Sequence, residues 1–150
     1  MKIGIAADRG GYQLKKYLID ILKKDKLDIF DFGCHDPTSI DYSKGYPDYA
    51  EIMGTRIYTG EYDRGILICA TGIGMSIAAN KMKGIRCALV HDVFSAEHTR
   101  KYNDSNVLAL GEMIIGPILA YTITKVWLNT DFKGNRKRIY KINEMENKTL

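Results

Sequence analysis

Short apolar runs alternate with longer segments of helical periodicity along most of the chain. Residues 3–7 are almost entirely apolar, as a buried strand would be, and between Tyr12 and Asp25 apolar side chains recur every three or four positions. That spacing places them on one face of a helix. The same alternation predicts strands at 3–7, 28–32, 65–69, 86–90 and 106–110, and helices at 12–25, 47–58, 75–81, 93–102 and 117–128.

Short strands that are apolar on both faces and alternate with helices are typical of a parallel sheet covered on both sides. The sequence therefore predicts an α/β fold, a single doubly wound three-layer αβα sandwich with a five-stranded parallel sheet. Right-handed crossovers favour the strand order 2-1-3-4-5, with a switch point between the first and third strands. Ligands bind beyond the carboxyl ends of strands at such a point, where the sequence places residues 8–11 and 69–76.

The composition, with 45% hydrophobic and 27% charged residues in a chain of 150, is that of one compact domain covering residues 1–150. No apolar run approaches the roughly 20 residues that span a bilayer, and the N-terminus lacks the pattern of a signal peptide. We therefore expect a cytoplasmic protein without a membrane partner. The three cysteines are irregularly spaced, which predicts free thiols and no metal site.

Positive charge is concentrated in the tail of the chain, between Lys133 and Lys141. Such a cluster is a solvated surface or an anion site, and we do not expect a nucleic acid partner. The longest irregular stretch runs from Gly33 to Tyr46. Long loops in compact domains tend to border functional sites.

A glycine turn directly follows the central predicted strand, in the sequence Cys69-Ala70-Thr71-Gly72-Ile73-Gly74. Glycines allow successive backbone N–H groups to converge on a ligand, and the helix that follows adds its positive end, so the turn suits an anion. A thiol beside such a cradle is readily ionised. A purely structural cysteine and a purely structural glycine turn remain the alternatives at this point.

An ionised Cys69 would act either as a nucleophile on a carbonyl or as a base that removes a carbon-bound proton. Acyl transfer normally requires a histidine beside the thiol, and the sequence fixes none there. Proton removal next to a carbonyl requires donors for an enediolate. The backbone amides of residues 72–76 and the hydroxyl of Thr71 are suited to that role.

The segment from Gly65 to Lys81, GILICATGIGMSIAANK, resembles the signature of type B ribose-5-phosphate isomerases and their galactose-6-phosphate isomerase relatives. Similar family patterns occur at residues 3–8, Asp41-Tyr42, 46–50, 91–96, 103–111 and 115–116. The resemblance implies a cofactor-independent aldose–ketose isomerase that acts through an enediolate. It also implies a homodimer, or a tetramer, with sites at the subunit interface.

By position, the resemblance gives Cys69 the role of the base that moves a proton between C1 and C2 of the sugar. Thr71 and the amides of Gly72, Ile73, Gly74, Met75 and Ser76 would hold the enediolate oxygens. Asp8 would assist ring opening or orient hydroxyls, Asn103 would bind the sugar, and Arg136 would hold the phosphate. Ribose 5-phosphate is the first expectation for the substrate. A hexose 6-phosphate of the allose or galactose type, or a catalytically weak sugar-phosphate-binding subunit, is the alternative.

The chain departs from the family pattern at several positions. Arg9 stands where a histidine is usual, and it can hold phosphate but cannot shuttle protons near neutral pH. Tyr102 stands where the family has the histidine that opens the ring, and tyrosine is a poorer acid–base group. His98, one helical turn earlier, is a candidate replacement.

Two family arginines also lack a direct counterpart in this chain. Glu112-Met113 occupies the place of an arginine that is common just after Gly111. The second tail arginine falls on Tyr140, and Arg138 would take its role if the tail is shifted.

Overall fold

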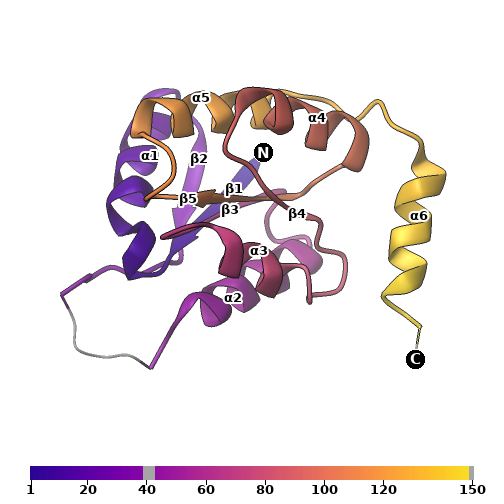
Figure 1. The fold of residues 1–150 in the computed structure, drawn as a ribbon, viewed down its shortest axis with the longest axis horizontal. Coiled ribbons are helices and arrows are strands. Elements are labelled where there is room, and N and C mark those ends of the chain that lie inside the picture. The colour runs from indigo at the N-terminus through magenta and orange to yellow at the C-terminus, as the bar shows by residue number, and fades with distance from the viewer. Residues whose placement is uncertain (39–42, 149–150) are drawn as a thin grey trace.

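The computed structural model describes residues 1–38 and 43–148, which form a parallel sheet with helices on both faces (Figure 1). Asp41 and Tyr42 lie outside the described residues. The strands are β1 (Lys2–Ala7), β2 (Asp28–Asp31), β3 (Arg64–Cys69), β4 (Cys87–Leu89) and β5 (Val107–Gly111). The helices are the short 3-10 helix η1 (Arg9–Gly11), α1 (Tyr12–Lys24), α2 (Tyr46–Tyr58), α3 (Ile73–Ala79), α4 (Val93–Asn103), α5 (Pro117–Leu128) and α6 (Arg136–Met145).

The helices form two layers, with α1, α4 and α5 on one face of the sheet and α2 and α3 on the other (Figure 1). The larger apolar cluster fills the first interface and includes the fully buried Trp127. A smaller cluster with Met53 and Met75 fills the second. The predicted three-layer α/β sandwich with a five-stranded parallel sheet is therefore confirmed.

The predicted order of the last two strands is wrong, because the sheet runs β2-β1-β3-β5-β4. All five residues of β5 are buried, which suits a strand with neighbours on both sides. The three-residue β4 has Leu89 partly exposed and suits the edge. The return from β4 to β5 reverses the direction of the crossover, and a right-handed crossover then puts α4 on the face of α1 and α5.

The switch point between β1 and β3 is unaffected, since these two strands are direct neighbours in register. Proline begins α2 and α5 within their first turn, where its missing N–H costs nothing. Asp92 caps α4 by accepting a hydrogen bond from Ser95 N at 2.7 Å. These local signals explain why the predicted helices form close to the expected positions.

The basic tail contains a helix that the sequence pattern did not predict. Asn135 caps α6 through a hydrogen bond from Lys137 N, and none of the residues of α6 is buried. Figure 1 shows α6 standing beside the sandwich at the far end of the chain. A hydrogen bond from Gly84 N to Glu146, just after α6, joins this end of the chain to the loop before β4. Among the described residues, no helix is long and apolar enough to cross a membrane.

Candidate active site

Cys69 ends β3 and lies inside a tight turn. Its side chain is buried, and its Sγ accepts a hydrogen bond from the backbone N–H of Gly72 at 3.1 Å. Gly72 has φ +77°, and a Cβ on it would lie 2.9 Å from the carbonyl carbon of Leu110 in β5. Glycine is therefore required for the turn to lie against β5 and to aim this N–H at the sulfur. The Gly72 N–H is therefore placed to stabilise negative charge on the sulfur.

The first turn of α3 continues from this cysteine turn. Ile73 N donates to the Oγ1 of Thr71 at 3.3 Å, and Ser76 N donates to Gly72 O at 3.0 Å. The amides between them belong to the start of the helix, where N–H groups have no acceptor within the helix itself. The structure thus brings together Cys69, Thr71 and the amides of residues 72–76, as the sequence predicts.

Tyr46, at the start of α2, covers the same turn. A Cβ on Gly74 would lie 2.9 Å from Cε2 of the Tyr46 ring, so glycine is needed for the ring to approach this closely. The ring is partly exposed. Sequence reasoning placed Tyr46 only within a family pattern and gave it no role. The start of a helix at Tyr46-Pro47, after the long loop, was the signal that could have placed it there.

Asp8 follows β1 on the other side of the cysteine turn. Its N–H donates to Ile68 O at 3.3 Å, and its Oδ1 accepts from Gly10 N at 2.9 Å. Burial raises the pKa of Asp8 and the charge of Glu112 acts in the same direction, whereas hydrogen bonds from the Gly10 and Gly11 backbone oppose the rise. Asp8 is thus placed next to the predicted base and retains a proton more readily than an exposed aspartate does.

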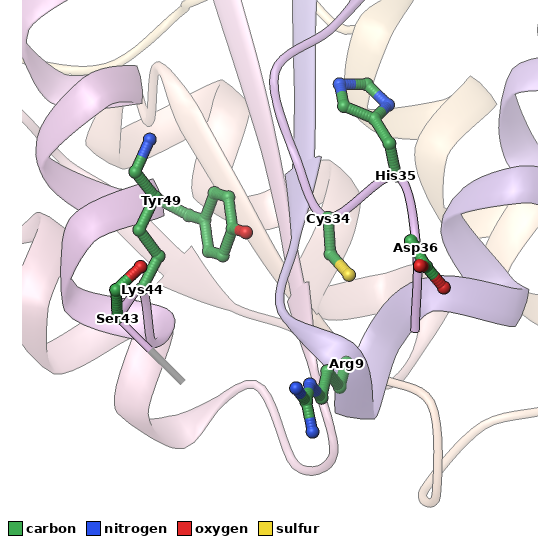
Figure 2. Close-up of a pocket in the computed structure, with 7 residues that line it drawn as sticks. All are labelled: Arg9, Cys34, His35, Asp36, Ser43, Lys44 and Tyr49. Carbon is green, nitrogen blue, oxygen red and sulfur yellow. The ribbon is translucent and has the colours of Figure 1, made fainter. Parts of the chain in front are cut away.

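Arg9 lines a pocket of about 250 Å³ next to this centre (Figure 2). The other lining residues are Cys34, His35 and Asp36 from the loop after β2, Ser43 and Lys44 just before α2, and Tyr49 in α2. Figure 2 shows Arg9 and Lys44 on different walls of the pocket, with the ring of Tyr49 between Lys44 and Cys34. The two cations suit a phosphate, and the hydroxyls of Ser43 and Tyr49 suit the hydroxyls of a sugar.

Cys69 is not among the residues that line this pocket. The connection between them is Gly10, where a Cβ would lie 2.9 Å from Ala70 N. The lining residues from the loop after β2 were not predicted as site residues. Only the length of that loop pointed to them, since it carries no motif that stands out by itself.

Tyr102 and Asn103 lie at the opposite end of the strands from Cys69. Both are exposed at the carboxyl end of α4, and the chain then turns at Asp104, with φ +51°, to enter β5. Asp104 is held by Arg86, just before β4, and by Arg100 at 3.1 and 2.8 Å. These residues therefore mark the amino ends of the strands. The six residues of β3 correspond to about 20 Å between the amino end of that strand and Cys69 at its carboxyl end.

His98 and the basic tail lie in the same part of the molecule as Tyr102 and Asn103, far from Cys69. The His98 ring lies between those of Phe94 and Tyr102, with centroid distances of 5.2 and 4.5 Å. Lys133 N donates to Lys101 O, which holds the start of the tail against the end of α4. Arg136 and Arg138 are exposed on α6. The predicted site residues thus form two groups, and one copy of the chain does not bring them together.

In the part of the chain that the structure describes, the remaining thiols and the acidic residues offer no metal site. All three cysteines are free, and burial raises the pKa of Cys87 to about 12, as expected for a packing residue. Within residues 1–38 and 43–148, no group of three or more His, Cys, Asp or Glu side chains is arranged to hold a metal ion.

Comparison with known proteins places these features in a wider context. Residues 3–144 match the model of the family described as Ribose/Galactose Isomerase. The chain is 44% identical to ribose-5-P isomerase B of Listeria innocua, over 97% of this chain and 95% of that protein. It is 43% identical to D-erythrulose-4-phosphate isomerase of Pectobacterium atrosepticum, over 89% and 86%. The solved structure of Clostridium thermocellum ribose-5-phosphate isomerase B is similar with a TM-score of 0.91, at 47% identity and 97% coverage of both chains.

Proposed function

The chain belongs to the ribose/galactose isomerase family of sugar-phosphate isomerases, and we propose that it interconverts ribose 5-phosphate and ribulose 5-phosphate with Cys69 as the base. The observation that carries this proposal is the position of the Cys69 thiol. It ends a strand at the switch point and accepts an N–H from the turn whose amides open α3. A thiolate beside convergent amides is suited to proton transfer at a carbon next to a carbonyl.

The proposed reaction follows from this arrangement. Cys69 takes the proton from C2 of the open-chain aldose and returns it to C1, so that the carbonyl moves from C1 to C2. The intermediate enediolate carries negative charge on its oxygens. The amides at the start of α3 and the Thr71 hydroxyl belong to the turn that holds the thiol and would donate to those oxygens. Arg9, on the adjoining pocket, would bind the phosphate or a hydroxyl at the far end of the sugar.

We further propose that a second copy of the chain completes each site. Tyr102 and Asn103 lie at the amino ends of the strands, about one strand length from Cys69 of their own copy, and Arg136 lies on α6, which follows them. Exposed apolar side chains surround the cysteine turn and give a second copy a surface to cover. They are Ile73, Leu89, Met113 and Ile114, which are between 39% and 78% exposed.

An assay over aldose phosphates tests the reaction and the substrate together. The pure protein is given ribose 5-phosphate, allose 6-phosphate, galactose 6-phosphate and erythrose 4-phosphate, each carrying deuterium at C2. We expect turnover of ribose 5-phosphate with loss of deuterium to water. Retention of deuterium in every bound sugar would overturn the isomerase proposal and favour the weak sugar-phosphate-binding subunit, for which Tyr102 in place of the family histidine is the reason.

Two alanine variants test the base. Cys69→Ala should lower kcat by about 10²–10⁴-fold, which is the usual contribution of a general base. Cys87→Ala is the control for the loss of a buried sulfur, because its thiol lies in β4 and bonds the Ser76 side chain rather than the Gly72 N–H that the Cys69 sulfur accepts. Equal activity in the two variants would exclude Cys69 as the base.

Mixing two inactive variants tests the shared site. Cys69→Ala and Asn103→Ala each disable both sites of a symmetric dimer, whereas a mixed dimer has one site with neither substitution. After the subunits exchange, we expect activity to recover to about a quarter of the wild-type value, since half of the dimers are mixed. No recovery despite demonstrated exchange would mean that one copy supplies the whole site.

A further inference from the structure

The turn between α4 and β5 contains an aspartate in a backbone conformation that favours glycine. Asp104 is the C-cap residue of α4, with φ +51° and ψ +41° in the left-handed region. A residue with a side chain adopts this region less readily than glycine does, because its Cβ approaches the following carbonyl oxygen. The presence of aspartate here is explained by what its carboxylate binds.

Two arginines hold Asp104 and the carbonyl groups of the turn. Arg86, just before β4, donates from Nε to Asp104 O at 2.8 Å and from Nη2 to Asp104 Oδ2 at 3.1 Å. Arg100, four residues earlier in α4, donates from Nη1 to Asp104 Oδ1 at 2.8 Å and to Ser105 O at 2.7 Å. Arg100 is only 3% exposed. These three residues, Asp104, Arg86 and Arg100, are called the Asp104 clamp below.

The residue after the clamp is fixed by the helix layer. Ser105 is buried, its N–H donates to Thr99 O at 3.3 Å, and its Oγ accepts from Trp127 Nε1 of α5 at 2.8 Å. The N–H of Asp104 donates to the same Thr99 carbonyl. The carboxyl end of α4 therefore has partners for polar groups that lack them at an ordinary helix end, and it is held against fraying.

These contacts lie directly beside the pair that the proposed site requires from a second copy. Tyr102 and Asn103 are the last two residues of α4, and both are exposed. A side chain in the last turn of a helix can be held only as firmly as that turn is held. The position of Asn103 therefore depends on the clamp formed by the residue that follows it.

We propose that Asp104, held by Arg86 and Arg100, is a positioning residue that fixes Asn103 for the active site of the second copy. The inference rests on the proposed function, since it names what supports the part of the shared site that α4 carries. Asp104 acts only through Asn103, because its own carboxylate is engaged with the two arginines. A misplacement of about 1 Å away from the reacting atoms can lower activity about 10²-fold.

The variant Asp104→Asn tests the clamp while keeping a residue that tolerates the left-handed conformation. Its side chain has one acceptor oxygen in place of two and no charge to match the arginines. We expect kcat/KM with ribose 5-phosphate to fall by about 10–100-fold. Arg86→Lys is a milder second variant, because lysine keeps the positive charge but has no planar fork to bond both O and Oδ2 of Asp104. It should lower kcat/KM in the same direction, and it replaces Asp104→Asn in every mixture below if that variant does not unfold cooperatively in urea.

Asp25→Asn is the matched control. Asp25 is the C-cap residue of α1, and its side chain is 27% exposed, against 26% for Asp104. It also joins a helix end to a distant element, since it accepts from Lys125 and Tyr121 of α5 at 2.8 Å each. No proposed site residue adjoins it in the sequence. This variant should keep the wild-type kcat/KM.

Mixing with Cys69→Ala separates positioning from a general loss of structure. If Asp104 acts through Asn103, Asp104→Asn damages the site that contains Cys69 of the other copy. A mixed dimer with Cys69→Ala then has one intact site, and activity should recover to about a quarter of the wild-type value after the subunits exchange. A purely structural role would damage the site that contains Cys69 of the same chain, and mixing would restore nothing.

The double variant Cys69→Ala/Asp104→Asn gives the reverse test. Mixed in equal amounts with the wild type, it should lower activity from a half to about a quarter of the wild-type value as subunits exchange, whereas Cys69→Ala alone should leave it at a half. An unchanged kcat/KM in Asp104→Asn would overturn the positioning role. So would recovery by Asn103→Ala but not by Asp104→Asn when each is mixed with Cys69→Ala, and the shared site would still stand. If Asn103→Ala gives no recovery, or the wild type converts no aldose phosphate, the proposed function fails and the positioning role fails with it.

Discussion

Replacing Gly72 by alanine should damage both the stability and the chemistry of the cysteine turn. At φ +77° an alanine carries the left-handed backbone penalty, about 1–2 kcal/mol. The added Cβ would also lie 2.6 Å from Cδ1 of Leu89 and 2.9 Å from the carbonyl carbon of Leu110. The leucine side chain can turn away but the backbone of β5 cannot, and such overpacking typically costs about 1–3 kcal/mol. The expected loss in the free energy of unfolding is therefore about 2–5 kcal/mol.

Gly60→Ala isolates the two contributions. Gly60 has nearly the same φ, +75°, and nothing lies within 4 Å of its added Cβ, so this variant should lose only about 1–2 kcal/mol. Urea unfolding gives both values, and isomerase kinetics give the second readout. Gly60→Ala should keep the wild-type kcat, whereas a displacement of the Gly72 N–H from the sulfur by about 1 Å should cost about 10²-fold. Equal losses of stability and equal kcat in the two variants would refute the reasoning that β5 forces glycine at this position.

Three further predictions follow from other parts of the molecule. Arg136→Ala should raise KM for the sugar phosphate by about tenfold or more with kcat nearly unchanged, because a phosphate contact acts equally in the ground and transition states. Steady-state kinetics measure both constants, and a fall in kcat at saturating substrate would contradict this prediction. Lys15→Met should lower the free energy of unfolding in urea by about 3 kcal/mol, since it removes the buried ammonium that bonds both Asp31 and the carbonyl of Cys34. A loss below about 1 kcal/mol would contradict this. Asp25→Asn should destabilise the protein above about pH 3.8 and have less effect below it, because hydrogen bonds from Lys125 and Tyr121 lower the pKa of Asp25 in the folded state. A stability difference from the wild type that stays constant from pH 6 to pH 2.5 would rule this out.

The strands and most helices of the fold could be predicted because their signals are local. An apolar run such as residues 65–69, followed by a glycine turn, specifies a buried strand and the end of that strand without reference to the rest of the chain. The order of β4 and β5 could not be predicted in this way. It depends on which strand is buried on both sides, and the short β4 and the wholly buried β5 show this only once they are paired.

The site divides along the same line. The proximity of Cys69, Thr71 and the amides of residues 72–76 could be predicted because one continuous segment contains them all. The contacts of Tyr46 with Gly74 and of Glu112 with Leu14 join segments that are far apart in the sequence, and no periodicity reports them. The separation of Tyr102 from Cys69 likewise follows from the direction of α4 relative to the sheet.

The two ends of the proposed site have different consequences for substrate choice. The cysteine turn is proposed to act on C1 and C2, which every aldose phosphate presents in the same way, so this end would not distinguish a pentose from a tetrose or a hexose. Relatives named for a pentose phosphate and for a tetrose phosphate are almost equally similar to this chain, at 44% and 43% identity. The length of the sugar must then be recognised by the residues that bind its phosphate, since the distance from the phosphate to C2 grows with each carbon. In this protein Arg9 is fixed beside the turn by η1, whereas Arg136 is exposed on a helix at the other edge of the sheet. We therefore expect the choice between sugars of different length to depend on how a second copy of the chain places α6. It should depend less on any residue next to the thiol.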